Sequence, residues 1–186
     1  MAGAAQGRHP SPHFTGAAVR VQIDGGRSTI PIIPHAMPFT VHDRDFENRV
    51  RQSFARQRAM ETIGARLVHV APGEVDIELP FRDDLTQQDG FLHAGIVSTI
   101  LDSSCGYAGY TLMPQGAGVL SIEFKVNLLA PAVGERVIAR GRVVRAGRTI
   151  SVSKADAFAL RGGEERHVST MTATLMAVAG RDAVSG

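Results

Sequence analysis

The sequence predicts an α+β domain in which one antiparallel sheet curls around a single long helix. Residues 94–112 form a helix-length run of small and apolar side chains with one charged residue, Asp102. Two stretches with strand-like patterns precede this run and four longer ones follow it. A helix that is apolar on nearly all sides is expected to be buried on nearly all sides, and the predicted strands are available to cover it.

Length and charge narrow the class of protein. At 186 residues the chain fits one ordinary domain plus a tail, and a net charge of +2 with scattered basic residues does not favour nucleic-acid binding. No apolar run approaches the ~20 residues that span a bilayer, and no signal peptide is recognisable. The single cysteine, Cys105, cannot form an intrachain disulfide. We therefore expect a soluble, cytoplasmic protein that does not bind a membrane, with Cys105 as a packed core residue.

The domain is expected over residues 43–180, between an N-terminal extension of residues 1–42 and a short tail of residues 181–186. The extension is expected to be flexible or to lie on the surface. Its apolar residues could dock onto the domain or a neighbouring subunit: Ile30, Ile32, Ile33 and Phe39. Proline opposes regular strand pairing, and three prolines interrupt the apolar part of the extension: Pro31, Pro34 and Pro38.

The first element of the domain is predicted to be an amphipathic helix that Asp43 or Asp45 caps and Gly64 ends. Apolar residues recur at helical spacing, at Phe46, Val50, Phe54, Ala55, Ala59 and Ile63. The other side carries Arg49, Arg51, Arg56 and Arg58. This side is expected to be a solvated basic face, and contact with the phosphates of a substrate is the alternative.

The strands are predicted from alternation and turn residues. Residues 65–70 and 74–79 flank Ala-Pro-Gly and predict a hairpin, followed by a polar loop. After the central helix, the remaining strands are predicted over residues 119–128, 136–145, 149–160 and 166–178. Strict alternation in the first of these would place Ser121, Glu123, Lys125 and Asn127 on one face and Leu120, Ile122, Phe124, Val126 and Leu128 on the other.

Asp102 is the one charged residue in a helix that is expected to be buried, and burial alone does not account for it. A buried carboxylate is costly unless it is paired, hydrogen-bonded or protonated, so a structural hydrogen bond and a catalytic role are the two interpretations. The sequence contains no cluster of residues at metal-ligand spacing and no glycine-rich phosphate loop. We therefore expect no metal and no cofactor.

The residues around this helix resemble those of a known family. Gln87 is followed after five residues by His93-Ala94-Gly95, Asp102 comes seven positions later, and the next strand reads S-I-E-F-K-V-N-L-L-A-P-A. This pattern closely resembles the hotdog-fold acyl-CoA thioesterases, in particular the PaaI-like type of the phenylacetate pathway. The resemblance implies a hotdog fold, a dimer or a dimer of dimers, and hydrolysis of aryl-acetyl, aromatic or medium-chain acyl-CoA.

The resemblance also implies roles for individual residues. Asp102 matches the catalytic carboxylate, and Ala94 matches the residue whose backbone N–H polarises the thioester carbonyl. Further site residues that it implies are Gln87, His93 and Ser121, and we assign substrate binding to Gly95, Tyr107 and Arg148. Most family members read His-Gly-Gly where this chain reads His-Ala-Gly, but alanine supplies the same N–H. Tyr110 and Met113 could also line the acyl pocket. Simpler roles remain open: a loop hydrogen bond for His93, a strand hydroxyl for Ser121, and core packing for Tyr107, Tyr110 and Met113.

The spacing between Ala94 and Asp102 indicates how many chains form the site. Eight residues separate Ala94 from Asp102, which is about 12 Å along a helix. One acyl carbon must lie about 3 Å from both its attacking group and its oxyanion donors. We therefore expect a homodimer or homotetramer with active sites at the subunit interface, the carboxylate acting as nucleophile or general base. The alternatives are a non-catalytic acyl-CoA binding or sensing module and a hotdog hydratase or dehydratase.

Overall fold

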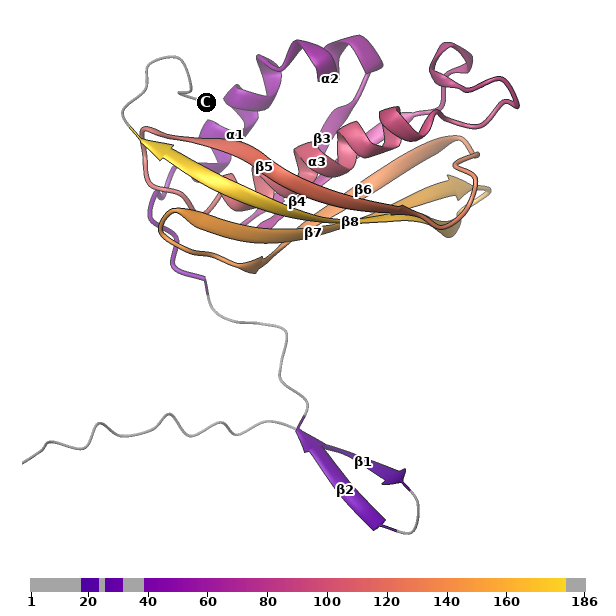
Figure 1. Ribbon diagram of the computed structural model, residues 1–186. Helices are drawn as coiled ribbons and strands as arrows, with labels where there is room; N and C mark the ends of the chain where they lie inside the picture. The colour runs from indigo at the N-terminus through magenta and orange to yellow at the C-terminus, as the bar shows by residue number, and fades with distance from the viewer. Residues whose placement is uncertain (1–17, 24–25, 32–38, 180–186) are drawn as a thin grey trace, which may run out of the picture. The chain divides into compact units, whose positions relative to one another are not determined.

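The computed structural model describes residues 18–23, 26–31 and 39–179. The chain divides into two compact units, residues 1–38 and residues 39–186. The larger unit is built on one six-stranded antiparallel sheet in the order β3-β4-β6-β7-β8-β5 (Figure 1). Its strands are β3 (Arg66–Ala71), β4 (Glu74–Pro80), β5 (Ala117–Leu128), β6 (Arg136–Arg145), β7 (Ile150–Arg161) and β8 (Glu164–Ala179). The predicted fold class and all six predicted strands are confirmed.

Helix α3 (Ala94–Tyr110) lies in the concave side of the curved sheet (Figure 1). Its side chains Ile100, Leu101 and Cys105 are fully buried, and small residues of the facing strands let the helix approach closely. At Gly141 of β6, a Cβ atom would collide with the backbone of Ser104. The predicted burial of this helix is therefore confirmed over most of its length. No helix among residues 39–179 is long and apolar enough to cross a membrane.

The predicted amphipathic helix is two helices. Helix α1 (Phe46–Ala55) and helix α2 (Arg58–Ile63) are separated at Gln57, which has an extended backbone with φ −80° and ψ 91°. Gly64 ends α2 in the left-handed conformation, as predicted. Asp45 occupies the N-cap position of α1 but makes no capping hydrogen bond with its side chain. A 3-10 turn, η1 (Asp83–Leu85), lies in the loop that precedes α3.

A β-bulge changes the predicted faces of β5. The register shifts between Ser121 and Glu123, so that Ser121 pairs with Leu175 while Phe124 pairs with Ala173. Residues that pair directly across two strands share a face, and Leu175 and Ala173 both point into the core. Ser121 and Phe124 therefore lie on the same, helix-facing side. The prediction that strict alternation separates them is wrong, because the bulge inserts one residue, Ile122, between them.

The smaller unit contains a hairpin that was not expected. Strands β1 (Ala18–Ile23) and β2 (Gly26–Pro31) pair antiparallel. The first proline of this region, Pro31, is the last residue of β2, so no proline interrupts the paired segments. The predicted apolar residues Ile32 and Ile33 lie outside the described residues. In the larger unit, Phe39 is partly buried and packs against the core, as expected for a docked residue.

Candidate active site

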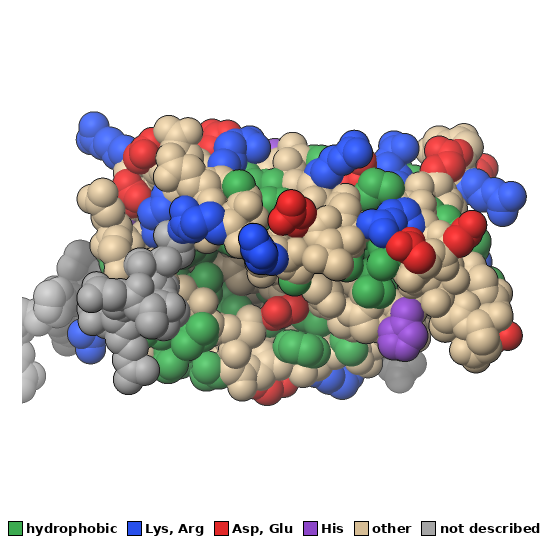
Figure 2. Space-filling view, turned by 90° about the horizontal axis from the view of Figure 1, so that it is seen from above, with side chains coloured by type: hydrophobic (Ala, Val, Ile, Leu, Met, Phe, Trp, Pro, Cys, Tyr) green, Lys and Arg blue, Asp and Glu red, His purple; other side chains and the backbone are tan. Residues whose placement is uncertain are grey.

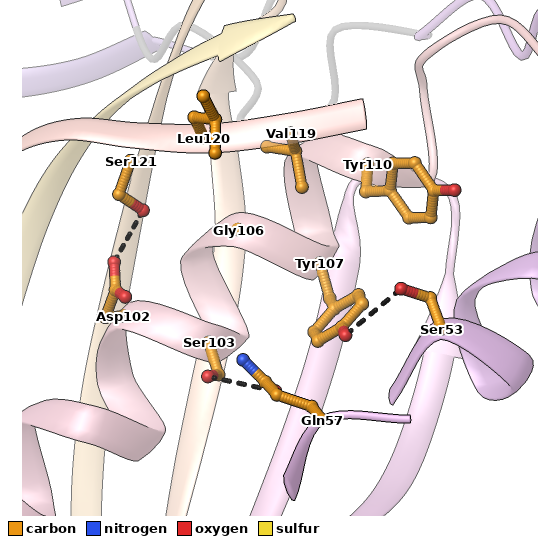
Figure 3. A pocket seen from close by; sticks show the side chains of 10 residues that line it. All are labelled: Ser53, Gln57, Asp102, Ser103, Gly106, Tyr107, Tyr110, Val119, Leu120 and Ser121. Atoms are coloured by element: carbon orange, nitrogen blue, oxygen red, sulfur yellow. Dashed lines mark hydrogen bonds between the residues drawn. The ribbon is translucent and has the colours of Figure 1, made fainter. Parts of the chain in front are cut away.

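A cavity of about 370 Å³ lies beside α3. Its wall comes from α3, from the start of β5, from α1 and from Gln57, which lies between α1 and α2 (Figure 3). Its lining residues are Ser53, Gln57, Asp102, Ser103, Gly106, Tyr107, Tyr110, Val119, Leu120 and Ser121. In the space-filling view, this side of the molecule is hollowed, with hydrophobic side chains along the hollow and several Lys and Arg side chains beside it (Figure 2).

The Asp102 carboxylate and the Ser121 hydroxyl meet at one end of this cavity (Figure 3). The Ser121 hydroxyl donates a hydrogen bond to Asp102 Oδ1 at 2.6 Å. Ser121 faces α3 because it pairs with the core residue Leu175 of β8, and the bulge that follows it keeps Phe124 on the same side. Asp102 is half-buried, and one carboxylate oxygen remains available to accept a proton or to attack an electrophile. The arrangement fits a nucleophile or a general base that a neighbouring hydroxyl orients.

Polar pairs join α3 to α1 and to Gln57 along another wall of the cavity. The hydroxyls of Tyr107 and Ser53 lie 3.3 Å apart, and Ser103 Oγ donates to Gln57 Oε1 at 3.5 Å. Burial raises the pKa of Tyr107, so its hydroxyl stays protonated at neutral pH and keeps its hydrogen for a partner. The Tyr107 ring also contacts Tyr110 edge to face, with centroids 6.2 Å apart. Tyr107 thus both packs and lines the cavity.

The start of α3 presents a free backbone donor. His93 is the N-cap residue, and its Nδ1 accepts a hydrogen bond from the Gly95 N–H at 3.0 Å. No acceptor for the Ala94 N–H is found among the described residues. A helix N-terminus carries a partial positive charge, so the Ala94 N–H is suited to an anionic oxygen. The Gly95 N–H, by contrast, is already occupied by His93.

The cavity brings together only part of the predicted site. Asp102, Ser121 and Tyr107 line it, whereas Ala94, Gly95 and His93 lie at the other end of α3 and are not part of its wall. Gln87 also lies outside it, and its side-chain oxygen accepts the Asp89 N–H within the loop. Arg148 is exposed in the connection between β6 and β7.

Tyr110, for which core packing and a place in the acyl pocket were both open, also lines the cavity. The other six residues of the wall were not predicted from the sequence: Ser53, Gln57, Ser103, Gly106, Val119 and Leu120. Helical spacing from Asp102 would have indicated Gly106, since it lies four residues further on the same helix face. The sequence held no comparable signal for Ser53 and Gln57. They come from a separate segment, and only the packing of α1 against α3 brings them to the cavity.

Several other residues have structural partners. Three arginines of β6 form ion pairs: Arg136 with Glu78, Arg140 with Glu165, and Arg142 with Asp76 and Glu74. Cys105 is fully buried and desolvation raises its pKa, so it packs in the core as predicted. Within residues 39–179, no group of three or more His, Cys, Asp or Glu side chains is placed to hold a metal ion.

Known proteins resemble this chain in both sequence and fold. A family model described as the thioesterase superfamily matches residues 89–165. The crystal structure of a thioesterase family protein from Silicibacter pomeroyi is 57% identical, with a TM-score of 0.72, and the match covers 73% of this chain and 99% of that one. Human acyl-coenzyme A thioesterase 13 is 29% identical over 91 residues, which cover 48% of this chain and 64% of that protein.

A more distant solved structure resembles the chain in fold alone. The PaaI protein of the Escherichia coli phenylacetic acid degradation operon is 11% identical, with a TM-score of 0.67 over 76% of this chain and 98% of that one. At this identity the likeness concerns the fold, which in this chain is the antiparallel sheet and long helix described above. The likeness to this structure shows the hotdog fold, and the family model and the relative at 57% identity show that the chain belongs to the thioesterase superfamily and is a thioester hydrolase.

Proposed function

We propose that this protein hydrolyses acyl-CoA thioesters to the free acid and CoA, with Asp102 as the group that attacks the thioester or activates water. The observation that carries this proposal is the Asp102 carboxylate, which faces a cavity of about 370 Å³ and accepts a hydrogen bond from Ser121. The name of the human relative, acyl-coenzyme A thioesterase 13, supports CoA thioesters as the substrate class. Aryl-acetyl, aromatic and medium-chain acyl groups are the proposed acyl groups.

Two routes fit the carboxylate. As a general base, Asp102 takes a proton from a water molecule while the water oxygen attacks the thioester carbonyl carbon. As a nucleophile, it attacks that carbon itself and forms a mixed anhydride that water then hydrolyses. Both routes pass through a tetrahedral oxyanion, and in both the C–S bond breaks when the CoA thiolate leaves. The oxyanion needs backbone or side-chain donors within about 3 Å.

We propose that the oxyanion donor comes from a second subunit. The free Ala94 N–H starts the helix that carries Asp102, and eight residues of helix separate the two by about 12 Å. This separation is too large for one carbonyl group to contact both. Two chains with antiparallel α3 helices would place Ala94 of one beside Asp102 of the other, which gives two equivalent sites.

Exposed apolar side chains of β5 support such an assembly. This strand is an edge of the sheet, and several large apolar side chains on it and just after it are about half exposed. They are Leu120 (42%), Ile122 (51%), Phe124 (47%), Leu128 (57%) and Leu129 (52%). Exposed apolar side chains along an edge strand are typical of an interface between subunits. The proposed assembly is a homodimer or homotetramer.

We also propose roles in the assembled site for three further residues, Gln87, His93 and Arg148. His93 orders the start of α3 through its bond to Gly95 and thereby orients the Ala94 N–H. Gln87 lies in the preceding loop, where it would help to place the substrate or water. Arg148 is exposed and carries a fixed positive charge, which suits a phosphate group of CoA.

Replacing the carboxylate tests the proposal. Asp102→Asn keeps the shape of the side chain but removes its ability to take a proton or to attack, so we expect kcat to fall by about 10²–10⁴-fold. Release of free thiol from a panel of acyl-CoAs measures this, and circular dichroism checks that the fold persists. Unchanged turnover in the folded variant would contradict the proposal. A wild-type protein that binds acyl-CoA without releasing thiol would indicate a binding module.

A further inference from the structure

Helix α3 contains a glycine that packing does not require. Gly106 is buried in the interior of the helix, where glycine is less favourable than alanine. A Cβ atom built at this position would have no heavy atom within 4 Å among the described residues, apart from the nearby backbone of its own helix. The structure therefore has room for a methyl group at Gly106, and something other than close packing must account for the glycine.

The neighbouring glycines of α3 show the contrast. A Cβ at Gly109 would lie 2.6 Å from Leu175 Cδ1, so close packing against β8 requires glycine there. A Cβ at Gly95 would lie 3.1 Å from His93 Nδ1, in the cap of the helix. The free space beside Gly106 is the cavity that contains Asp102, which Gly106 lines (Figure 3).

Along α3, Gly106 lies between the Asp102 carboxylate and the Tyr110 ring, which both line the cavity. Asp102, Gly106 and Tyr110 are spaced four residues apart and share one face of α3. Four residues advance about 6 Å along a helix. A thioester carbonyl held at Asp102 would thus bring the atoms a few bonds along its acyl chain over Gly106. At that point the helix backbone, without a side chain, forms the floor of the cavity.

We infer that Gly106 sets the width of the acyl site and admits an acyl group that carries a ring or a branch a few carbons from the thioester carbonyl. This inference rests on the proposed function. A ring needs width, and the absent side chain leaves that width between α3 and Val119 of β5. A methyl or isopropyl group at Gly106 would occupy this space. A short straight acyl chain needs little of it and would still reach Asp102.

The test compares a wide substrate with a narrow one. Phenylacetyl-CoA and butyryl-CoA are assayed with the wild type, Gly106→Ala and Gly106→Val. We expect kcat/KM for phenylacetyl-CoA to fall about 10-fold in Gly106→Ala and about 100-fold in Gly106→Val, because added methyl groups in an apolar site discriminate by such factors. For butyryl-CoA we expect a change of no more than about 3-fold. The readout is the ratio of the two values.

Gly109→Ala is the matched control, because it adds the same methyl group three residues later against Leu175 instead of the cavity. It should lower the melting temperature and leave the substrate ratio unchanged. Equal losses on both substrates in Gly106→Ala, or no loss on either, would overturn the inference. If the wild type releases thiol from neither substrate, the proposed function fails separately. In that case the inference is tested by calorimetric measurement of phenylacetyl-CoA binding. We expect Gly106→Val to bind phenylacetyl-CoA about 10-fold more weakly than the wild type. Unchanged binding would overturn the inference.

Discussion

At the scale of single residues, the pair Asp102 and Ser121 determines what the cavity can do. The Ser121 hydroxyl is the side-chain donor found for Asp102 within residues 39–179, at 2.6 Å. A hydrogen bond to a charged group is worth more than one between neutral groups, and it fixes the direction of the carboxylate. One donor also leaves the remaining lone pairs of the carboxylate free for water or substrate. Ser121 is therefore a positioning residue for Asp102.

Ser121→Ala should lower kcat by about 10–100-fold, which corresponds to the ~1.5–3 kcal/mol of a hydrogen bond to a charged group. Because Ser121 is exposed on an edge strand, the melting temperature should change little. Steady-state kinetics and thermal unfolding measure the two effects. Ser121→Thr retains the hydroxyl and should recover part of the loss. A variant with wild-type kcat would show that the hydroxyl does not act through Asp102.

Cys105 should be unreactive while the protein is folded. Desolvation raises the pKa of its thiol, so at pH 8 the thiol stays protonated in the fully buried site, and only a thiolate reacts readily. We expect a thiol-specific reagent at pH 8 to label the native protein at least about 100-fold more slowly than the protein in denaturant. Rapid labelling under native conditions would contradict the described burial.

At the scale of elements, α3 is held at both of its ends. His93 caps its N-terminus, while Arg49 of α1 binds its C-terminal end. The Arg49 guanidinium donates to the carbonyl oxygens of Met113 at 2.8 Å and Tyr110 at 3.2 Å. Its Nε lies 2.8 Å from Asp43, and its side chain is only 12% exposed. The prediction of a solvated face is wrong for Arg49, because the last carbonyls of a helix attract a cation.

Arg49→Ala should destabilise the protein by about 1.5–3 kcal/mol, because it leaves carbonyl groups of the α3 terminus without their charged donor. Urea unfolding measures this free energy. The control is Arg51→Ala on the same helix, where the ion pair with Glu47 at 2.8 Å is about half exposed. That substitution should cost no more than about 0.5 kcal/mol. Equal effects of the two substitutions would contradict the role given to Arg49.

At the scale of the whole molecule, one chain holds two incomplete halves of the proposed site. Asp102 lies in the cavity at the middle of α3, and the free Ala94 N–H lies at its start. The half-exposed apolar residues of β5 lie beside the cavity, since Ser121 of the same strand lines it. An assembly through this edge would bury the apolar side chains and complete both sites at once.

Mixed oligomers test this arrangement. Ala94→Pro removes the N–H, and proline is tolerated at the first position of a helix. His93 has φ −59° and ψ 136°, which a residue before proline readily adopts. Ala94→Pro and Asp102→Ala should each be nearly inactive alone. An equal mixture, unfolded and refolded together, should form half mixed dimers with one intact site each and recover about a quarter of wild-type activity.

Recovery in this experiment needs exchange of subunits, so the same variants refolded separately and then combined serve as the control and should stay inactive. Mixed dimers are identified by native mass spectrometry with one variant carrying an affinity tag. If verified mixed dimers show no activity while both parent variants are folded, the oxyanion donor and the carboxylate do not come from different chains.

Much of the fold follows from local sequence patterns. The strand boundaries came from alternation and turn residues, and the burial of α3 came from its small and apolar composition. These patterns can be recognised in the sequence because the spacing of buried side chains within a helix or strand is set by the geometry of that element alone. Two of the wrong predictions in residues 39–179, the faces of β5 and the single helix before β3, have a shared cause. The bulge at Ile122 and the break at Gln57 both interrupt a period, and neither carries a proline or glycine to mark it.

By itself, the sequence determined the α+β class and the order of the elements in the domain. It also singled out Asp102 as the one charged residue in a helix that is expected to be buried. Only the tertiary structure decided what surrounds Asp102. Pairing of β5 with β8 points Ser121 toward it, α1 and the segment after it bring Ser53 and Gln57 to the same cavity, and Gly106 leaves the floor open. The physical reason is that cavity walls form where segments distant in sequence pack together, and periodicity within one segment contains no information about that packing.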